Sequence, residues 1–247
     1  MCAKLAIAKA IIDAERRSLL YIDPQKSRDR PLKAASQSWL AHFLRDITRG
    51  HRSDRLEDAF ANLTVVNFNY DRCFEHFTYN WLQNFYKLTE QNAATLVRGI
   101  SVYHPYGRIA PLGWEDPSTG VAYGSSIDTH SLIAMSNRIR TYSEVFEPDS
   151  GLIQVRERLK KASAAVFLGF GFHKQNMDIL SIGGPLTSEN LHLYCTKSGI
   201  PNPKWAIVLD RVKLSFSRIS TGCIIDHSFN AHCEEFWEEY SDVILYG

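Results

Sequence analysis

Apolar and polar residues alternate along the chain in a way that predicts short strands between helices. Apolar residues recur at helical spacing, every three or four positions, in most of the chain. The helices expected from this spacing cover residues 3–20, 38–50, 56–62, 74–85, 131–142, 152–162 and 231–245, and one more starts near 176–178. Short apolar runs predict strands at 63–68, 96–104, 166–168, 191–196 and 222–225, while 205–214 fits a helix or a mixed segment. Apolar strands that alternate with helices indicate an α/β fold with a parallel sheet flanked by helices.

Length and composition fit one soluble globular domain. The chain has 247 residues, of which 45% are hydrophobic and 22% charged. Its net charge of +1 argues against a protein that mainly grips nucleic acid or an anionic membrane. No run of about 18 apolar residues is present, so we expect no membrane span.

The cysteine pattern argues against a fold held together by zinc or by disulfides. All five are scattered and none forms a Cys-x-x-Cys pair: Cys2, Cys73, Cys195, Cys223 and Cys233. Their pattern argues against a zinc ribbon and against a disulfide framework, and it fits a cytoplasmic protein.

Polar side chains interrupt the chain where the strand at 63–68 gives way to a helix. Asn67, Asn69 and Asp71 stand at this junction, around Phe68. In open α/β sheets ligands bind at the carboxyl ends of strands, so these amides and this carboxylate are candidate site residues. The alternative is local: Asp71 caps the helix and Asn69 is a turn residue.

A histidine follows the next predicted strand. The strand at 96–104 ends at His104, and Gly107 marks a turn just after it. Such a histidine is either structural or a general base. Residues 110–130 have no element pattern and are expected to be a lid over a site or a disordered insertion.

A second strand-to-helix junction carries two glycines. After the strand at 166–168 come Gly169, Phe170 and Gly171, and the next helix starts near Asn176. Glycines let a backbone approach an anion, and a helix N-terminus favours negative charge. A tight turn without a ligand explains the same residues.

These three pieces together resemble bacterial sirtuin-like domains. Residues 67–71 (NFNYD), followed by Glu75, resemble the Thr-Thr-Asn-Tyr-Asp signature of that family. His104 with Gly107 resembles its His-Gly motif, and Gly169 to Gly171 resembles its later glycine turn, with Gly171 where the family usually has Ser. The missing Cys-x-x-Cys pairs place the resemblance in the zinc-free branch.

The resemblance implies a Rossmann-like parallel sheet that binds NAD, without zinc. In it Asn69 orients the ribose or an attacking water, His104 is the general base, and Asp71 holds the hydrogen-bond network. Asn67 and Phe68, with Gly169, Phe170, Gly171 and Asn176, are expected to contact the cofactor. The activity implied is NAD glycohydrolysis, which releases nicotinamide and ADP-ribose, in a setting such as phage defence; the alternative is a non-catalytic module that senses ADP-ribose or another nucleotide, or serves assembly.

The resemblance also sets expectations about the whole chain. The family's opening strand and Gly-Ala-Gly loop have no counterpart before residue 63, so a single domain over 1–247 is expected to be N-terminally incomplete. A sheet that lacks its first strand exposes an edge, which leads to the hypothesis of a homo-oligomer. A metal-dependent hydrolase using Asp71, His104, His173 and His227 is a third hypothesis, although these residues lack a recognised ligand spacing.

Overall fold

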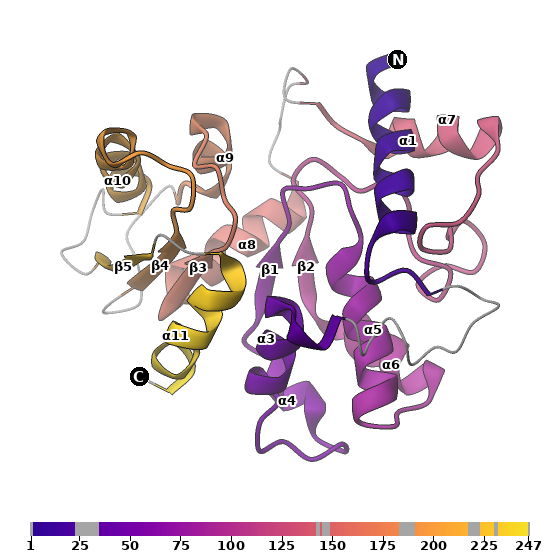
Figure 1. Cartoon of the computed structure of the whole chain (residues 1–247), viewed down its shortest axis with the longest axis horizontal. Coiled ribbons are helices and arrows are strands. Elements are labelled where there is room, and N and C mark those ends of the chain that lie inside the picture. The colour runs from indigo at the N-terminus through magenta and orange to yellow at the C-terminus, as the bar shows by residue number, and fades with distance from the viewer. Residues whose placement is uncertain are drawn as a thin grey trace. The chain divides into compact units, whose positions relative to one another are not determined.

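The computed structural model describes residues 2–22, 35–141, 144, 149–182, 191–216, 223–229 and 232–246. Backbone contacts divide the chain into two compact units, Met1–Val145 and Phe146–Gly247. Each unit contains its own parallel strands (Figure 1). The chain is therefore a mixed α/β protein with parallel strands in each unit.

The first unit surrounds one pair of strands with helices. Strands β1 (Thr64–Val66) and β2 (Ser101–Tyr103) pair in parallel, with Val65 opposite Val102. The helices of this unit are α1 (Cys2–Arg17), the 3-10 turn η1 (Ala35–Gln37), α3 (Trp39–Ile47), α4 (Leu56–Phe60), α5 (Cys73–Phe85), α6 (Glu90–Gly99) and α7 (Thr129–Arg138). Helices α5 and α6 form the crossover between the two strands, as a parallel pair requires.

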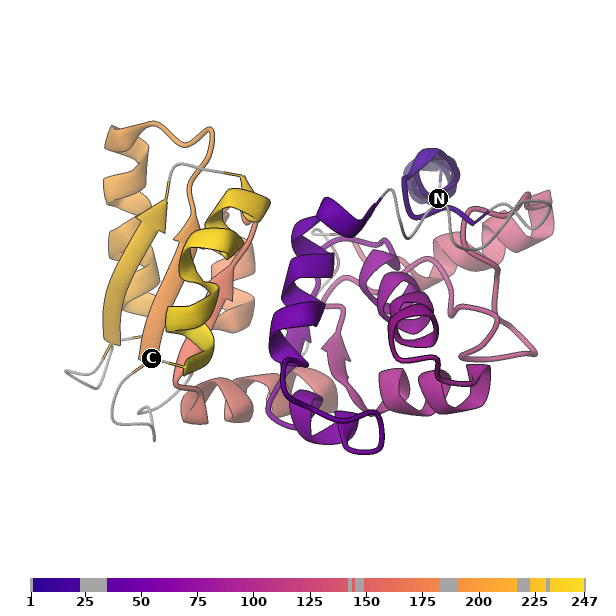
Figure 2. The same cartoon turned by 60° about the horizontal axis from the view of Figure 1, so that its bottom comes forward.

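Side-chain caps and two apolar clusters explain why these helices form. Ser38, Thr89 and Asp128 each accept a hydrogen bond from a backbone N–H in the first turn of α3, α6 and α7. The larger cluster joins α3, α4, α5 and α6, and Leu44, Leu56 and Leu82 are fully buried in it. A smaller cluster joins α1 to α7, which lie side by side in Figures 1 and 2.

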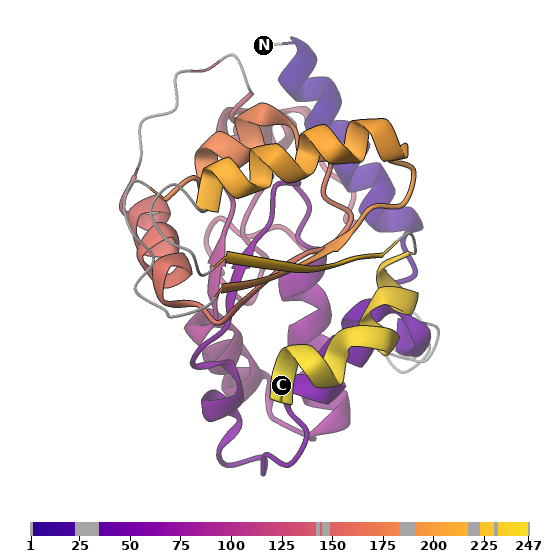
Figure 3. The ribbon, with the colours of Figure 1, turned by 90° about the vertical axis from the view of Figure 1, so that its left-hand side faces the viewer.

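The second unit is a three-stranded parallel sheet with helices on both faces. Its strands β3 (Ala164–Phe167), β4 (Leu191–Thr196) and β5 (Cys223–Phe229) pair in sequence order. Its helices are α8 (Ser150–Lys161), α9 (Lys174–Leu180), α10 (Asn202–Phe216) and α11 (Cys233–Tyr246). Helix α10 packs against α9, while α11 covers the opposite face of the sheet (Figures 2 and 3).

Most of the expected elements are confirmed, and one is wrong. The ambiguous segment at 205–214 lies within helix α10. The predicted strand at 96–104 is wrong in its first half, because Leu96 to Gly99 form the last turn of α6 and only 101–103 are strand. Residues 183–190 and 217–222 lie outside the described part of the chain, so the predicted start of the last strand at residue 222 lies there too. Among the described residues, no helix is long and apolar enough to cross a membrane.

Candidate functional site

The predicted site residues of the first unit lie where β1 and β2 end. The Asn67 N–H donates to the carbonyl of Tyr103 at 2.9 Å, which extends the strand pairing by one step. The Asn67 side chain then accepts a hydrogen bond from the Asn69 N–H at 2.9 Å, so it shapes the turn. Phe68 packs edge-on against Tyr106, with ring centroids 6.1 Å apart. The Asn69 side chain is exposed.

Asp71 has a local structural task at the start of α5. Its carboxylate accepts a hydrogen bond from the Cys73 N–H at 3.0 Å. That N–H is one of the donors that a helix start leaves without an intrahelical partner. The N-cap of α5 is Arg72, so the alternative that Asp71 caps the helix is off by one residue, although its carboxylate still bonds to the first turn next to the turn made by Asn67 and Asn69.

His104 is held between two hydrogen-bond acceptors. Its Nε2 lies 2.9 Å from Oε1 of Glu75, and its Nδ1 lies 3.3 Å from the backbone carbonyl of Asn69. The His104 side chain is 8% exposed and that of Glu75 is 4% exposed. The ends of both strands therefore meet, and His104 contacts Asn69 as expected. The contact is made by the backbone carbonyl of Asn69, not by its side-chain amide.

A charged network extends from His104 through Glu75. The Arg108 guanidinium donates through Nη1 to Glu75 Oε1 at 3.0 Å and to Glu115 Oε1 at 2.8 Å. Burial by itself raises the pKa of Glu75, but the hydrogen bond from His104 and the charges of His104 and Arg108 outweigh it, so the pKa lies below its ordinary value. Glu75 is therefore ionised at neutral pH.

Sequence reasoning gave no role to Glu75, Arg108 or Glu115. Glu75 was visible only as part of the resemblance to the family signature. One available signal was its position: it lies one helical turn after Asp71, inside the aromatic face of α5, where an unpaired carboxylate would be costly. A buried acid on such a face indicates a partner, and His104 at the next strand end is that partner.

The turn after His104 has a steric reason for its glycine. Gly107 has a φ of +77°, and a Cβ at this position would lie 2.2 Å from the carbonyl oxygen of Arg138 at the end of α7. The Arg140 N–H donates to the Tyr106 carbonyl at 2.8 Å in the same contact. The glycine of the predicted His-Gly motif is thus required by packing, whatever the motif does chemically.

The irregular segment after this turn is ordered, so it is not a disordered insertion. Fully buried Arg72 donates to the Val121 carbonyl at 2.6 Å and forms a two-pronged ion pair with Glu15 of α1, at 2.9 and 2.6 Å. Tyr123 stacks on His76, with ring centroids 3.9 Å apart. Side chains from α1 and α5 therefore hold the segment in place.

The glycine turn of the second unit connects β3 to α9. Gly169 has a φ of +59°, and its N–H donates to the Thr196 hydroxyl at 2.8 Å. Phe172 is buried in a left-handed conformation with a φ of 52°. Phe170 packs against it within an aromatic cluster, and Asn176 lies half-buried on α9. These predicted cofactor contacts belong to the second unit, while Asn69, Asp71 and His104 belong to the first.

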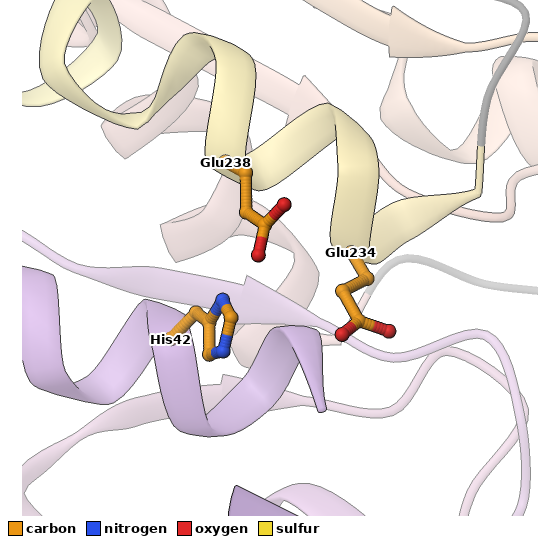
Figure 4. Close-up of side chains that lie close together, drawn as sticks. All are labelled: His42, Glu234 and Glu238. Carbon is orange, nitrogen blue, oxygen red and sulfur yellow. The ribbon is translucent and has the colours of Figure 1, made fainter. Parts of the chain in front are cut away.

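No metal centre is assigned within either unit. Figure 4 draws Glu234 and Glu238, which lie one turn apart on α11, together with His42 of α3 in the other unit. Two glutamates one turn apart are common on a solvated helix face. Among the described residues Asp71, His104 and His173 belong to no cluster of three ligands, and the side chain of His227 lies outside the described set.

The first unit also has a surface groove away from these residues. It lies between α4 and α6 and is lined by Glu57, Phe60, Leu88, Thr95 and Gly99, among others. None of the predicted site residues lines it. It therefore adds no support to the site at the strand ends.

The chain was compared with known proteins, and nothing matches. No protein-family model, no curated protein and no solved structure is similar to it at a significant level. The resemblance to sirtuin-like domains thus depends on the three motifs alone.

Proposed function

We propose that the chain is a sirtuin-like protein with a Rossmann-like organisation that binds NAD and hydrolyses it to nicotinamide and ADP-ribose. One observation carries the proposal: His104 lies at the carboxyl ends of two parallel strands, against the Asn69 backbone and the Glu75 carboxylate. That edge of a parallel sheet is where nucleotide ligands bind. In this proposal the protein needs no zinc and acts in the cytoplasm, in a role such as phage defence.

The chemistry fits the residues at this edge. Hydrolysis breaks the bond between C1′ of the ribose and the nicotinamide nitrogen, and a water oxygen forms the new bond to C1′. Positive charge develops on the ribose as the bond breaks, so nearby electron-rich oxygens favour the transition state. The water loses a proton, which a neutral His104 accepts, while the exposed Asn69 amide orients the water or the ribose.

The second unit gives broader support for a nucleotide-binding fold. Its three parallel strands, with helices on both faces, are typical of such folds. The support from the glycine turn is limited, because the Gly169 N–H already donates to Thr196. For Phe170, Gly171 and Asn176 the proposed contact with the cofactor depends on the motif.

The test is incubation of the purified protein with NAD and chromatographic detection of nicotinamide. We expect His104→Ala to reduce the rate by about 10² to 10⁴, the usual contribution of a general base. His130→Ala is the matched control, because His130 is an exposed histidine on α7 of the same unit and should leave the rate unchanged. The proposal fails if the wild-type protein releases no nicotinamide and calorimetry detects no binding of NAD.

One observation favours a second candidate function, a module that binds ADP-ribose or NAD without turnover. Both ring nitrogens of His104 face acceptors, and the ring is nearly enclosed, so a water has little access to it. Calorimetry with ADP-ribose and with NAD separates the candidates, because the module binds a ligand but releases no nicotinamide. Light scattering on the same samples tests the accompanying proposal of a homo-oligomer; a monomer at micromolar concentration contradicts it.

A further inference from the structure

The two nitrogens of His104 face acceptors of different strength. Nε2 lies 2.9 Å from a carboxylate oxygen of Glu75, whereas Nδ1 lies 3.3 Å from the carbonyl of Asn69. A doubly protonated ring serves both acceptors. A neutral ring carries one N–H and serves only one of them, so loss of a proton forces a choice between the two nitrogens.

In the neutral ring the single proton should stay on Nε2, the nitrogen that faces the Glu75 carboxylate. Hydrogen bonds to an ionised acceptor are shorter and about twice as strong as those to a neutral one. Glu75 is buried, so water competes little for its charge. Arg108, clamped between Glu75 and Glu115, fixes the position of the carboxylate and balances its charge. Glu75, from α5, bonds to the ring itself, whereas Arg108 pairs with Glu75, and Glu115 pairs with Arg108 without contacting the ring.

We infer that Glu75 is a positioning residue that keeps the remaining proton of neutral His104 on Nε2 and so leaves Nδ1, beside the end of β1, to accept a proton. The choice of nitrogen stands on the geometry alone. Its consequence for the reaction rests on the proposed NAD glycohydrolase function. Glu75 does not touch the reacting atoms in this scheme, because it acts through the ring.

The second oxygen of Glu75 is consistent with a role beyond stability. Oε2 is buried and has no hydrogen-bond partner among the described residues. A buried acceptor without a partner destabilises a fold, and each such group in a native protein needs an explanation. A carboxylate retained for its effect on His104 provides one.

The first experiment measures the tautomer directly and needs no activity. Long-range proton–nitrogen NMR spectra of the full chain, labelled with ¹⁵N-histidine, report which nitrogen of neutral His104 carries the proton. We expect Nε2–H in the wild type and a mixture of both tautomers in Glu75→Met. Glu115→Gln is the control, because Glu115 contacts Arg108 but not His104, and it should keep Nε2–H. An Nδ1–H ring in the wild type overturns the inference, even where Glu75→Met fails to fold.

The second experiment measures nicotinamide release. Glu75→Gln keeps the shape of the side chain but removes its charge, and we expect kcat to fall by at least about tenfold with KM nearly unchanged. If the wild type is active and Glu75→Gln keeps the full kcat, the inference is overturned while the proposed function stands. If the wild type releases no nicotinamide and does not bind NAD, the proposed function fails; without release, the tautomer measurement alone decides the inference.

Discussion

Replacing Arg72 by Met should strongly destabilise the first unit. The guanidinium is completely buried and forms two hydrogen bonds with Glu15, whose side chain is 1% exposed. It also donates to the carbonyls of Pro111 and Val121, at 3.2 and 2.6 Å. Met fills a similar volume but leaves a buried carboxylate without its counter-charge and two carbonyls without this donor.

The expected loss follows from that unpaired charge. Removing one partner of a buried ion pair typically costs about 3 to 5 kcal/mol of the free energy of unfolding. At about 2 to 4 °C per kcal/mol for chains of this size, the melting temperature should fall by roughly 6 to 20 °C. Changing Glu15 to Met as well removes the stranded charge, so the double variant should recover most of the loss.

Urea denaturation followed by circular dichroism measures these differences. The control is Arg55→Met, which removes an exposed arginine paired with Asp58 in the same unit and should cost at most about 1 kcal/mol. If Arg72→Met lowers the free energy of unfolding no more than Arg55→Met does, the buried ion pair of Arg72 does not stabilise the first unit as argued. A double variant as unstable as Arg72→Met alone would show that the lost bonds to the two carbonyls, and not the charge of Glu15, dominate.

Two further predictions concern the same unit. Gly107→Ala should cost about 1 to 3 kcal/mol in urea denaturation, because φ is +77° and the new Cβ meets the Arg138 carbonyl, whereas Gly99→Ala, with open space around it, should be neutral or slightly stabilising. Burial lowers the pKa of His76 to about 4, while the unfolded chain titrates near 6.5. The stabilisation that neutral His76 contributes to the folded state is complete above pH 6.5. It is lost as the pH falls through 4, and the free energy of unfolding decreases by about 1.4 kcal/mol per pH unit. The free energy of unfolding, measured from pH 7 to 4, should therefore fall less steeply in His76→Phe than in the wild type, and an unchanged slope would contradict the argument.

Local sequence signals predicted most of the elements, because each carries its own physical cause. Ser36 and Ser38 both precede α3 as possible caps, and the cap is Ser38, whose hydroxyl accepts the Ala41 N–H at 3.4 Å. The apolar stripe from Phe74 to Phe85 is a helix; Phe77 and Leu82 are buried as expected of its inner face, whereas Phe85 at its end is exposed. Such signals depend on residues within one or two turns, so a single sequence contains them.

The wrong strand start shows where local signals compete. Leu96 and Val97 form a short apolar run that fits a strand or a buried helix equally well. The deciding features were Thr89, which caps α6, and the spacing of Ala93, Val97 and Ile100, which bury one face of it. Thr89 and Ala93 lie before the run and Ile100 lies after it, so the run by itself does not reveal the helix. The glycine at residue 99 then ends the helix just before β2.

The site was predicted in part, for a reason of distance along the chain. Asn69 and His104 were expected together because parallel strands end at the same edge, and β1 and β2 do pair. The contact between His104 and Glu75 joins residues 29 positions apart, and Arg108 and Glu115 join it from a segment without regular structure. No periodic pattern encodes such contacts.

The strand ends contain several polar groups, and their structural tasks help to separate them. Asn67 shapes the turn through the Asn69 N–H, and the Asp71 carboxylate accepts the Cys73 N–H at the start of α5. The turn and the helix need both of them even in a protein without a ligand. His104 and Glu75 differ, because neither caps a helix, and one oxygen of Glu75 has no partner among the described residues. A fold gains little stability from a buried histidine–carboxylate pair that an apolar pair could replace. If the junction has a chemical role, this pair is where to look for it, and substitutions at Asn67 or Asp71 should act mainly through stability.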